Sequence, residues 1–318
     1  MIKKTFMKKV NENIWILGSN GFIGKSLIKV LSNERNYYLH LLIHKNYNLK
    51  EIESYNCFIA NLSNIRKEFF LNYPPKVIFH ATRGGGRNIF WRYIKAYHGN
   101  KANQRLANMM LGLQHPPIVI YVSGSLMYGQ ISQEKQAIEG DSLNPYSYAR
   151  VYQYAEKPWL DAQKNQILDV RFARPGWIVG PSSWFYEFFW LPYKKKGKVP
   201  YYGNGNQLMS VVHYIDCANL IMSLYEFGRE FQDLNISPCE PITQYDFSSS
   251  LAELLAVELE QVSFSKLKWD VGKIAAEALT SSIPMQTKYP EIHTKTNIKF
   301  KSVKDILTDV VAILEHKK

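Results

Sequence analysis

Cysteine is scarce in this chain of 318 residues. Its three cysteines, Cys57, Cys217 and Cys239, lie far apart and are odd in number. Neither a disulfide framework nor a CxxC metal site is indicated, and a reducing compartment fits this usage. His80 and His213 have no second ligand at metal spacing, so both are expected to pack in strands and no metal site is predicted.

Long apolar runs are also missing. No stretch approaches the roughly 18 apolar residues that cross a membrane. The basic N-terminus has only a short apolar run, preceded by the polar residues 11–13, which is unlike a signal peptide. The sequence therefore predicts a cytoplasmic protein without membrane contact.

Acidic residues are outnumbered by basic ones. The chain has 39 Lys and Arg against 27 Asp and Glu, a formal net charge of +12. The lysines are scattered and no nucleic-acid reading motif is present, so no nucleic-acid partner is expected. A phosphorylated small molecule accounts for the charge equally well.

Short apolar runs alternate with longer segments of helical period through the first half of the chain. This rhythm predicts an α/β fold, a Rossmann-type doubly wound parallel sheet covered on both faces. We expect residues 1–180 to form the nucleotide-binding domain, with 211–240 returning to it, and residues 181–318 to form a smaller substrate-binding domain. The expected strands are 14–18, 37–44, 57–62, 76–82, 118–124 and 168–175, and the expected helices are 22–33, 63–71, 99–113, 146–164, 243–259 and 303–314.

A glycine motif follows the first expected strand directly and opens a helix. Strand, glycine loop and helix in this order favour a dinucleotide site over a merely structural turn. Glycines let the backbone approach a pyrophosphate, which then lies at the positive end of the helix. The loop residues predicted to bind cofactor are Gly18, Ser19, Asn20, Gly21, Phe22, Ile23 and Gly24.

The end of the second expected strand distinguishes the two nicotinamide dinucleotides. NAD binders place an acidic residue there to accept a bond from the ribose. Here His44 and Lys45 occupy the position, so a 2′-phosphate would meet a cation. The sequence favours NADP(H) over NAD(H), although a solvated lysine at a strand end is the plain alternative.

Further motifs resemble the extended short-chain dehydrogenase/reductase family, in its epimerase and dehydratase branch. They are ANLS (60–63), FHAT (79–82), Asn103, SGSLMYG (123–129), ARPGWIVGP (173–181) and the glycine-rich loop 203–218. The resemblance implies a homodimer, and it implies that further residues border the cofactor. These are Asn61 and Leu62 at the adenine, Ala81 and Thr82 after the fourth strand, and Pro175, Gly176, Trp177 and Ile178 at the nicotinamide.

Two catalytic positions depart from the family pattern. Gly124 stands at the hydroxyl position, and either Ser123 or Ser125 beside it would supply the lost hydroxyl or else form a plain strand-end turn. Tyr148 is followed at YxxxK spacing by Tyr152 in place of lysine. A cation about 4 Å away would lower a tyrosine pKa by about three units. Without it Tyr148 should remain a neutral phenol, which donates a proton but is a poor general base.

Substrate contacts are predicted at four further residues. Arg83 and Arg87 follow the fourth strand, where they would clamp a carboxylate or phosphate or else lie in a solvated loop. Trp184 opens an aromatic run that would either roof an apolar ligand or fill the core. Tyr128 is the turn tyrosine. Met209 and Asn61 depart from the sugar-nucleotide members of the family, which weakens the case for a nucleotide-sugar substrate.

Three functions remain open at this point. The first is an NADP(H)-dependent reductase or epimerase/dehydratase-like enzyme on a small carbonyl or hydroxyl compound, with Tyr148 as proton donor. The second is a dinucleotide-binding sensor or partner-binding protein without hydride chemistry. The third is a non-redox isomerase or cyclase on the same fold.

Overall fold

The protein is described here from a computed structural model that covers residues 12–32, 36–44, 52, 54–84, 89–132 and 134–316. Its centre is a seven-stranded parallel sheet in the order β11-β6-β5-β4-β1-β2-β3. This confirms the predicted α/β class and the doubly wound sheet. The strands are β1 (Glu12–Leu17), β2 (Tyr37–Ile43), β3 (Asn56–Ile59), β4 (Val77–His80), β5 (Ile118–Val122), β6 (Val170–Pro175) and β11 (Leu234–Ile236).

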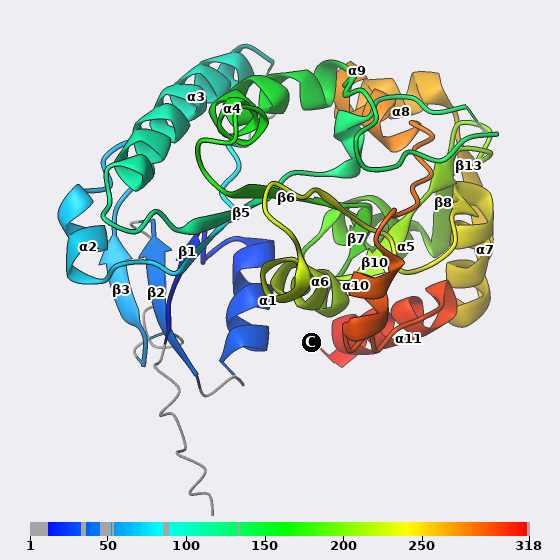
Figure 1. The fold of residues 1–318 in the computed structure, drawn as a ribbon. Helices are drawn as coiled ribbons and strands as arrows, with labels where there is room; N and C mark the ends of the chain where they lie inside the picture. The colour runs from blue at the N-terminus through cyan, green and yellow to red at the C-terminus, as the bar shows by residue number, and fades with distance from the viewer. Residues whose placement is uncertain are drawn as a thin grey trace, which may run out of the picture.

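Helices cover both faces of this sheet (Figure 1). The strands read as continuous apolar runs because each face is buried, and Trp15 and Ile16 of β1 are both inaccessible although they point to opposite sides. One face carries α1 (Phe22–Leu31), α6 (Tyr214–Phe227) and α10 (Pro290–Lys295), and the other carries α2 (Lys67–Asn72), α3 (Ile89–Leu111) and α4 (Ser147–Lys164).

A second hydrophobic cluster lies beyond the carboxyl end of the sheet. Phe185, Phe189 and Trp190 of the aromatic run are buried in it. Its elements are β7 (Trp177–Val179), the π-helical segment Tyr186–Trp190, α5 (Leu191–Lys196), β8 (Lys198–Tyr202), β9 (Leu208–Met209), β10 (Val211–His213), β12 (Ile242–Thr243), α7 (Gln244–Leu255), β13 (Glu258–Val262), α8 (Phe264–Val271), α9 (Lys273–Leu279) and α11 (Val303–His316). The boundary at residue 180 stays a prediction.

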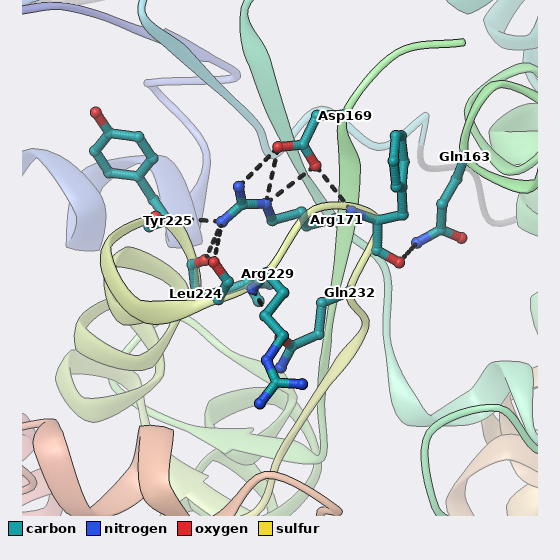
Figure 2. Close-up of polar contacts among 9 residues, drawn as sticks. Gln163, Asp169, Arg171, Leu224, Tyr225, Arg229 and Gln232 are labelled. Carbon is teal, nitrogen blue, oxygen red and sulfur yellow. Dashed lines mark hydrogen bonds and ion pairs between the residues drawn. The ribbon is translucent and has the colours of Figure 1, made fainter. Parts of the chain in front are cut away.

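A buried arginine, Arg171, holds the end of α6 against the central sheet. Arg171 of β6 donates from Nη1 to the carbonyl oxygens of Leu224 (3.0 Å) and Gly228 (2.8 Å), where α6 ends, and pairs with Asp169 at 2.7 Å (Figure 2). Helix carbonyls at a C-terminus have no partner within the helix and favour a cation. Arg171 therefore ties α6 to β6, and β11 follows as the edge strand.

Three predicted helices differ from the structure by four residues or more at one end, and the first of them, predicted over 63–71, is α2 and begins at Lys67. α3 begins at Ile89 rather than at residue 99. Arg92 and Ala96 of its first turns are buried against α4, whereas the aromatic side chains of these turns are exposed and do not mark the buried face. The helix predicted over 243–259 ends at Leu255, since Ala256 takes a left-handed φ of 52°. Residues 258–262 then pair with β8 as a parallel strand.

In the part of the chain that the structure describes, no helix is long and apolar enough to cross a membrane.

Candidate functional site

The glycine loop between β1 and α1 has a geometry that only glycine permits. Gly18 has a φ of +86°, and a Cβ on Gly24 would lie 2.1 Å from the carbonyl oxygen of Gly18. Gly21 stands at the start of α1, and no described side chain caps the helix there. The first amide groups of α1 therefore face an open cradle into which a phosphate fits.

A cavity of about 400 Å³ opens from this loop across the carboxyl ends of the strands. We call it the glycine-loop cavity. Several residues predicted to bind the cofactor line it, namely Gly18, Asn20, His44, Asn61, Leu62 and Thr82. α3 adds Lys95 and His98 from the opposite side. The cradle and the basic lining of the cavity fit a dinucleotide, which would lie from the loop toward Asn61.

A second cavity, of about 290 Å³, lies at the other side of the loop. We call it the aromatic cavity. It is lined by Phe22, Ser123, Ser125, Tyr148 and Trp184 together with Pro175, Gly176, Trp177 and Ile178. Trp184 contacts both Tyr148 and Trp177 edge to face, with ring centroids 5.0 and 5.5 Å apart. Arg83 is the one residue that lines both cavities among the described residues.

Tyr148 and Tyr152 lie one turn apart on α4, with ring centroids 5.5 Å apart. Burial, together with the neighbouring Tyr152, raises the pKa of Tyr148 to about 12, although Arg83 and Arg92 oppose the shift. The Arg92 guanidinium carbon lies 4.2 Å from the Tyr148 ring centre, and that of Arg83 lies 4.1 Å from the Tyr152 ring centre. Tyr148 is accordingly a neutral phenol at pH 7 beside two cations.

A family model supplies the context for this arrangement. The model for the NAD-dependent epimerase/dehydratase family matches residues 14–237. The chain belongs to this family. The resemblance drawn from the motifs is thereby confirmed, whereas no curated protein matches the chain in sequence.

Solved structures of similar fold come from the same group of proteins. The chain is similar to a dTDP-glucose 4,6-dehydratase of Bacillus anthracis in complex with NAD, at 19% identity and a TM-score of 0.76 over 96% of this chain and 97% of that one. A UDP-glucuronic acid 4-epimerase of Bacillus cereus with UDP-glucuronic acid and NAD has 16% identity and a TM-score of 0.77, covering 96% and 100%. A human epimerase family protein with NADPH has 15% identity and a TM-score of 0.74, covering 94% and 99%.

At the position where the family pattern has a hydroxyl side chain, this chain has Gly124. Ser123, beside it, donates to Oε2 of Glu156 at 2.8 Å and accepts from Nη1 of Arg174 at 3.0 Å. Burial raises the pKa of Glu156, although Arg174 and Ser123 lower it in part. The hydroxyl of Ser123 therefore belongs to a buried polar network, while Ser125 lines the aromatic cavity from the turn that follows β5.

Four predicted site residues have side chains that line neither cavity. Tyr128 is buried and donates to Asn235 at 2.7 Å, and it lines neither cavity, so its position does not support a substrate contact. Ser19 donates to the carbonyl oxygen of Leu42 at 2.6 Å. Ile23 packs into the core beneath α1, and Ala81 lies against Gly18. Lys45 and Arg87 lie outside the described residues.

The histidines expected in strands are structural. His80 lies 2.9 Å from Oδ1 of Asn103, and burial lowers the pKa of this histidine to about 4. His213 contacts Asp309 at 3.0 Å and accepts from the amide of Ile215 at the start of α6. Both are buried, as the sequence predicted.

Sequence reasoning missed the contribution of α3 to the cleft. Lys95 and His98 line the glycine-loop cavity and Arg92 contacts Tyr148, and all three lie in the first ten residues of α3, which were not predicted to be helical. Their spacing of three residues was a usable signal, since residues three and four apart share a helix face. The aromatic residues between them concealed it.

Proposed function

We propose that this family member is an NADP(H)-dependent reductase of a small carbonyl compound, with Tyr148 as the proton donor. The carrying observation is the position of Tyr148, a phenol with a pKa of about 12 in the wall of the aromatic cavity next to Pro175–Ile178. A group that holds its proton at neutral pH is suited to donate it to a carbonyl oxygen.

The residues of the aromatic cavity divide the work of such a reduction. When bound, a reduced nicotinamide supplies a hydride to the carbonyl carbon. Tyr148 gives its proton to the carbonyl oxygen, and the positive charges of Arg83 and Arg92 stabilise the phenolate that remains. Trp177 and Trp184 keep water from the reacting atoms.

The preference for NADP(H) is part of the proposal. His44 is exposed at the end of β2 and lines the glycine-loop cavity near Asn61. Glu156 is the only carboxylate among the described residues that line this cavity, and it is buried on α4. A 2′-phosphate at His44 would thus meet no negative charge from these residues, and NADPH should bind more tightly than NADH in a fluorescence titration.

The test is consumption of NADPH with a panel of carbonyl compounds. Tyr148→Phe should lower kcat at least about 100-fold, the usual worth of a positioned proton donor, and leave the affinity for NADPH unchanged. Tyr154→Phe is the matched control, because Tyr154 is exposed on the same helix and lines neither cavity. Equal activity of Tyr148→Phe and the parent protein would refute the role of Tyr148.

A second candidate function is dinucleotide binding without hydride chemistry, in a sensor or a protein that binds a partner. The observations that favour it are Gly124, Tyr152 and the engagement of Ser123 with Glu156. It predicts tight binding of the dinucleotide together with no turnover of any carbonyl compound in the panel.

We also expect a homodimer. α3 and α4 pack against each other and expose a group of aromatic side chains, which is unusual for a surface that stays in water. The mass of one chain is 36.9 kDa, and light scattering should give twice this value. The exposed aromatic residues are Phe90, Trp91, Tyr93, Tyr97 and Tyr154.

A further inference from the structure

Arg83 lies between the two positions at which the catalytic pattern is altered. Its guanidinium carbon is 4.1 Å from the ring centre of Tyr152, which stands at the lysine position. Its Nη2 atom is 4.0 Å from the point where a Cβ of Gly124 would lie. A Cβ at position 124 would only touch this guanidinium at ordinary contact distance, so the guanidinium lies directly beside the altered hydroxyl position, and Tyr152 supports it by a cation–π contact.

Arg83 forms no ion pair with a described carboxylate, although its charge acts on the buried Glu156 and lowers the pKa of that side chain in part. Among the residues that the structure describes, no Asp or Glu lies within ion-pair distance of it. Among the described residues that line the aromatic cavity, Arg83 is also the only charged one, and the others are apolar residues, serines, glycines and Tyr148. The described lining of this cavity thus combines an apolar wall with one planar cation.

We propose that Arg83 binds a carboxylate of the substrate, and that the substrate is an apolar molecule carrying this carboxylate beside the carbonyl group. A guanidinium accepts a carboxylate through two parallel hydrogen bonds, which fixes the orientation of the carbonyl next to it. The apolar body of such an oxo acid lies against Trp177 and Trp184, and its carbonyl lies toward Tyr148. This assignment of substrate class rests on the proposed function, but the binding site can be tested without turnover.

The test is a calorimetric titration with phenylacetate and with its neutral counterpart phenylacetamide. Arg83→Leu should weaken phenylacetate binding at least about tenfold, the worth of a charge-assisted pair, and Arg83→Lys should recover only part of the loss. Binding of phenylacetamide and of NADPH should stay within about twofold of the parent protein. Arg150→Leu removes an exposed arginine of α4 outside both cavities and should change none of the three affinities.

Three results would overturn the proposal. The first is a parent protein that does not bind phenylacetate or binds phenylacetamide as tightly. The second is an Arg83→Leu variant with unchanged phenylacetate affinity. The third is loss of NADPH binding in that variant without loss of phenylacetate binding, which would assign Arg83 to the dinucleotide phosphates. A protein that binds phenylacetate through Arg83 but reduces no carbonyl compound would refute the reductase function and keep the site.

Discussion

The two ends of the cleft are built by different means. At the glycine loop the backbone itself forms the cradle, and a Cβ on Gly24 would enter the space of a carbonyl oxygen. Around Tyr148 the chemistry depends on side chains, and here Gly124 and Tyr152 have replaced the expected hydroxyl and lysine while Arg83 brings a cation from another element. A site made of backbone leaves little freedom for change, whereas one made of side chains can be rearranged.

The largest expected effect is a loss of cofactor binding when the glycine loop is altered. Gly24→Ala places a methyl group 2.1 Å from the carbonyl oxygen of Gly18 and must displace the loop. Binding of NADPH should fall more than about 1,000-fold, or more than about 4 kcal/mol, as measured by the fluorescence of the reduced cofactor.

Gly112→Ala is the matched control for this variant. A Cβ at Gly112 would meet only the flexible end of Lys67 at 3.3 Å and more distant backbone atoms. It should bind NADPH like the parent protein. Normal affinity in Gly24→Ala would show that the cradle does not hold the phosphates.

The next largest effect is a loss of folding stability at acid pH, which the buried His80 causes. The pKa of buried His80 is lowered to about 4, so the unfolded state takes up a proton at a higher pH than the folded state does. The free energy of unfolding should therefore decrease as the pH falls from about 6.5 to about 4, by about 3 kcal/mol from this residue. His40, with a pKa of about 4, adds a similar slope.

His80→Gln tests the contribution by denaturant titration across this range. The variant should lose part of the slope and keep the part that His40 contributes. An unchanged slope would mean that His80 does not titrate with a lowered pKa in the folded protein.

The buried network of Glu156, Ser123 and Arg174 should give the free energy of unfolding a pH dependence of the opposite sign. Burial raises the pKa of Glu156, so the folded state holds a proton that the unfolded state has already released. The free energy of unfolding should fall as the pH rises from the ordinary glutamate pKa through this raised pKa. Glu156→Gln should remove that fall, and chemical denaturation at a series of pH values measures it; a fall of equal size in the variant would contradict the assignment.

The smallest expected effect comes from restoring the lysine. Tyr152→Lys places an ammonium group one turn from Tyr148, which should lower the pKa of this phenol and make it a better base. We expect a severalfold gain in alcohol oxidation and a pH profile shifted to lower pH, without a matching gain in carbonyl reduction. Tyr154→Lys adds the same charge on the exposed side of α4 and should change neither rate.

The sequence predicted the features that depend on local order. The glycine loop was readable because strand, glycines and helix follow one another along the chain, and the parallel sheet was readable because strands buried on both faces are continuously apolar. The contacts of Arg83 and Arg92 with the two tyrosines were not readable, since they join α4 to residues some 60 positions away. Nor could the start of α3 be predicted, because Phe90, Trp91 and Tyr93 are exposed in its first turns, so the apolar residues there do not mark a buried helix face.

A structure with NADPH and an apolar oxo acid bound tests the central claim most directly. The nicotinamide should lie beside Pro175–Ile178, with the substrate carbonyl oxygen within about 3 Å of the Tyr148 hydroxyl and its carboxylate on Arg83. A dinucleotide held at the glycine loop with its nicotinamide outside the aromatic cavity would contradict the account and leave a protein that binds the cofactor without using it.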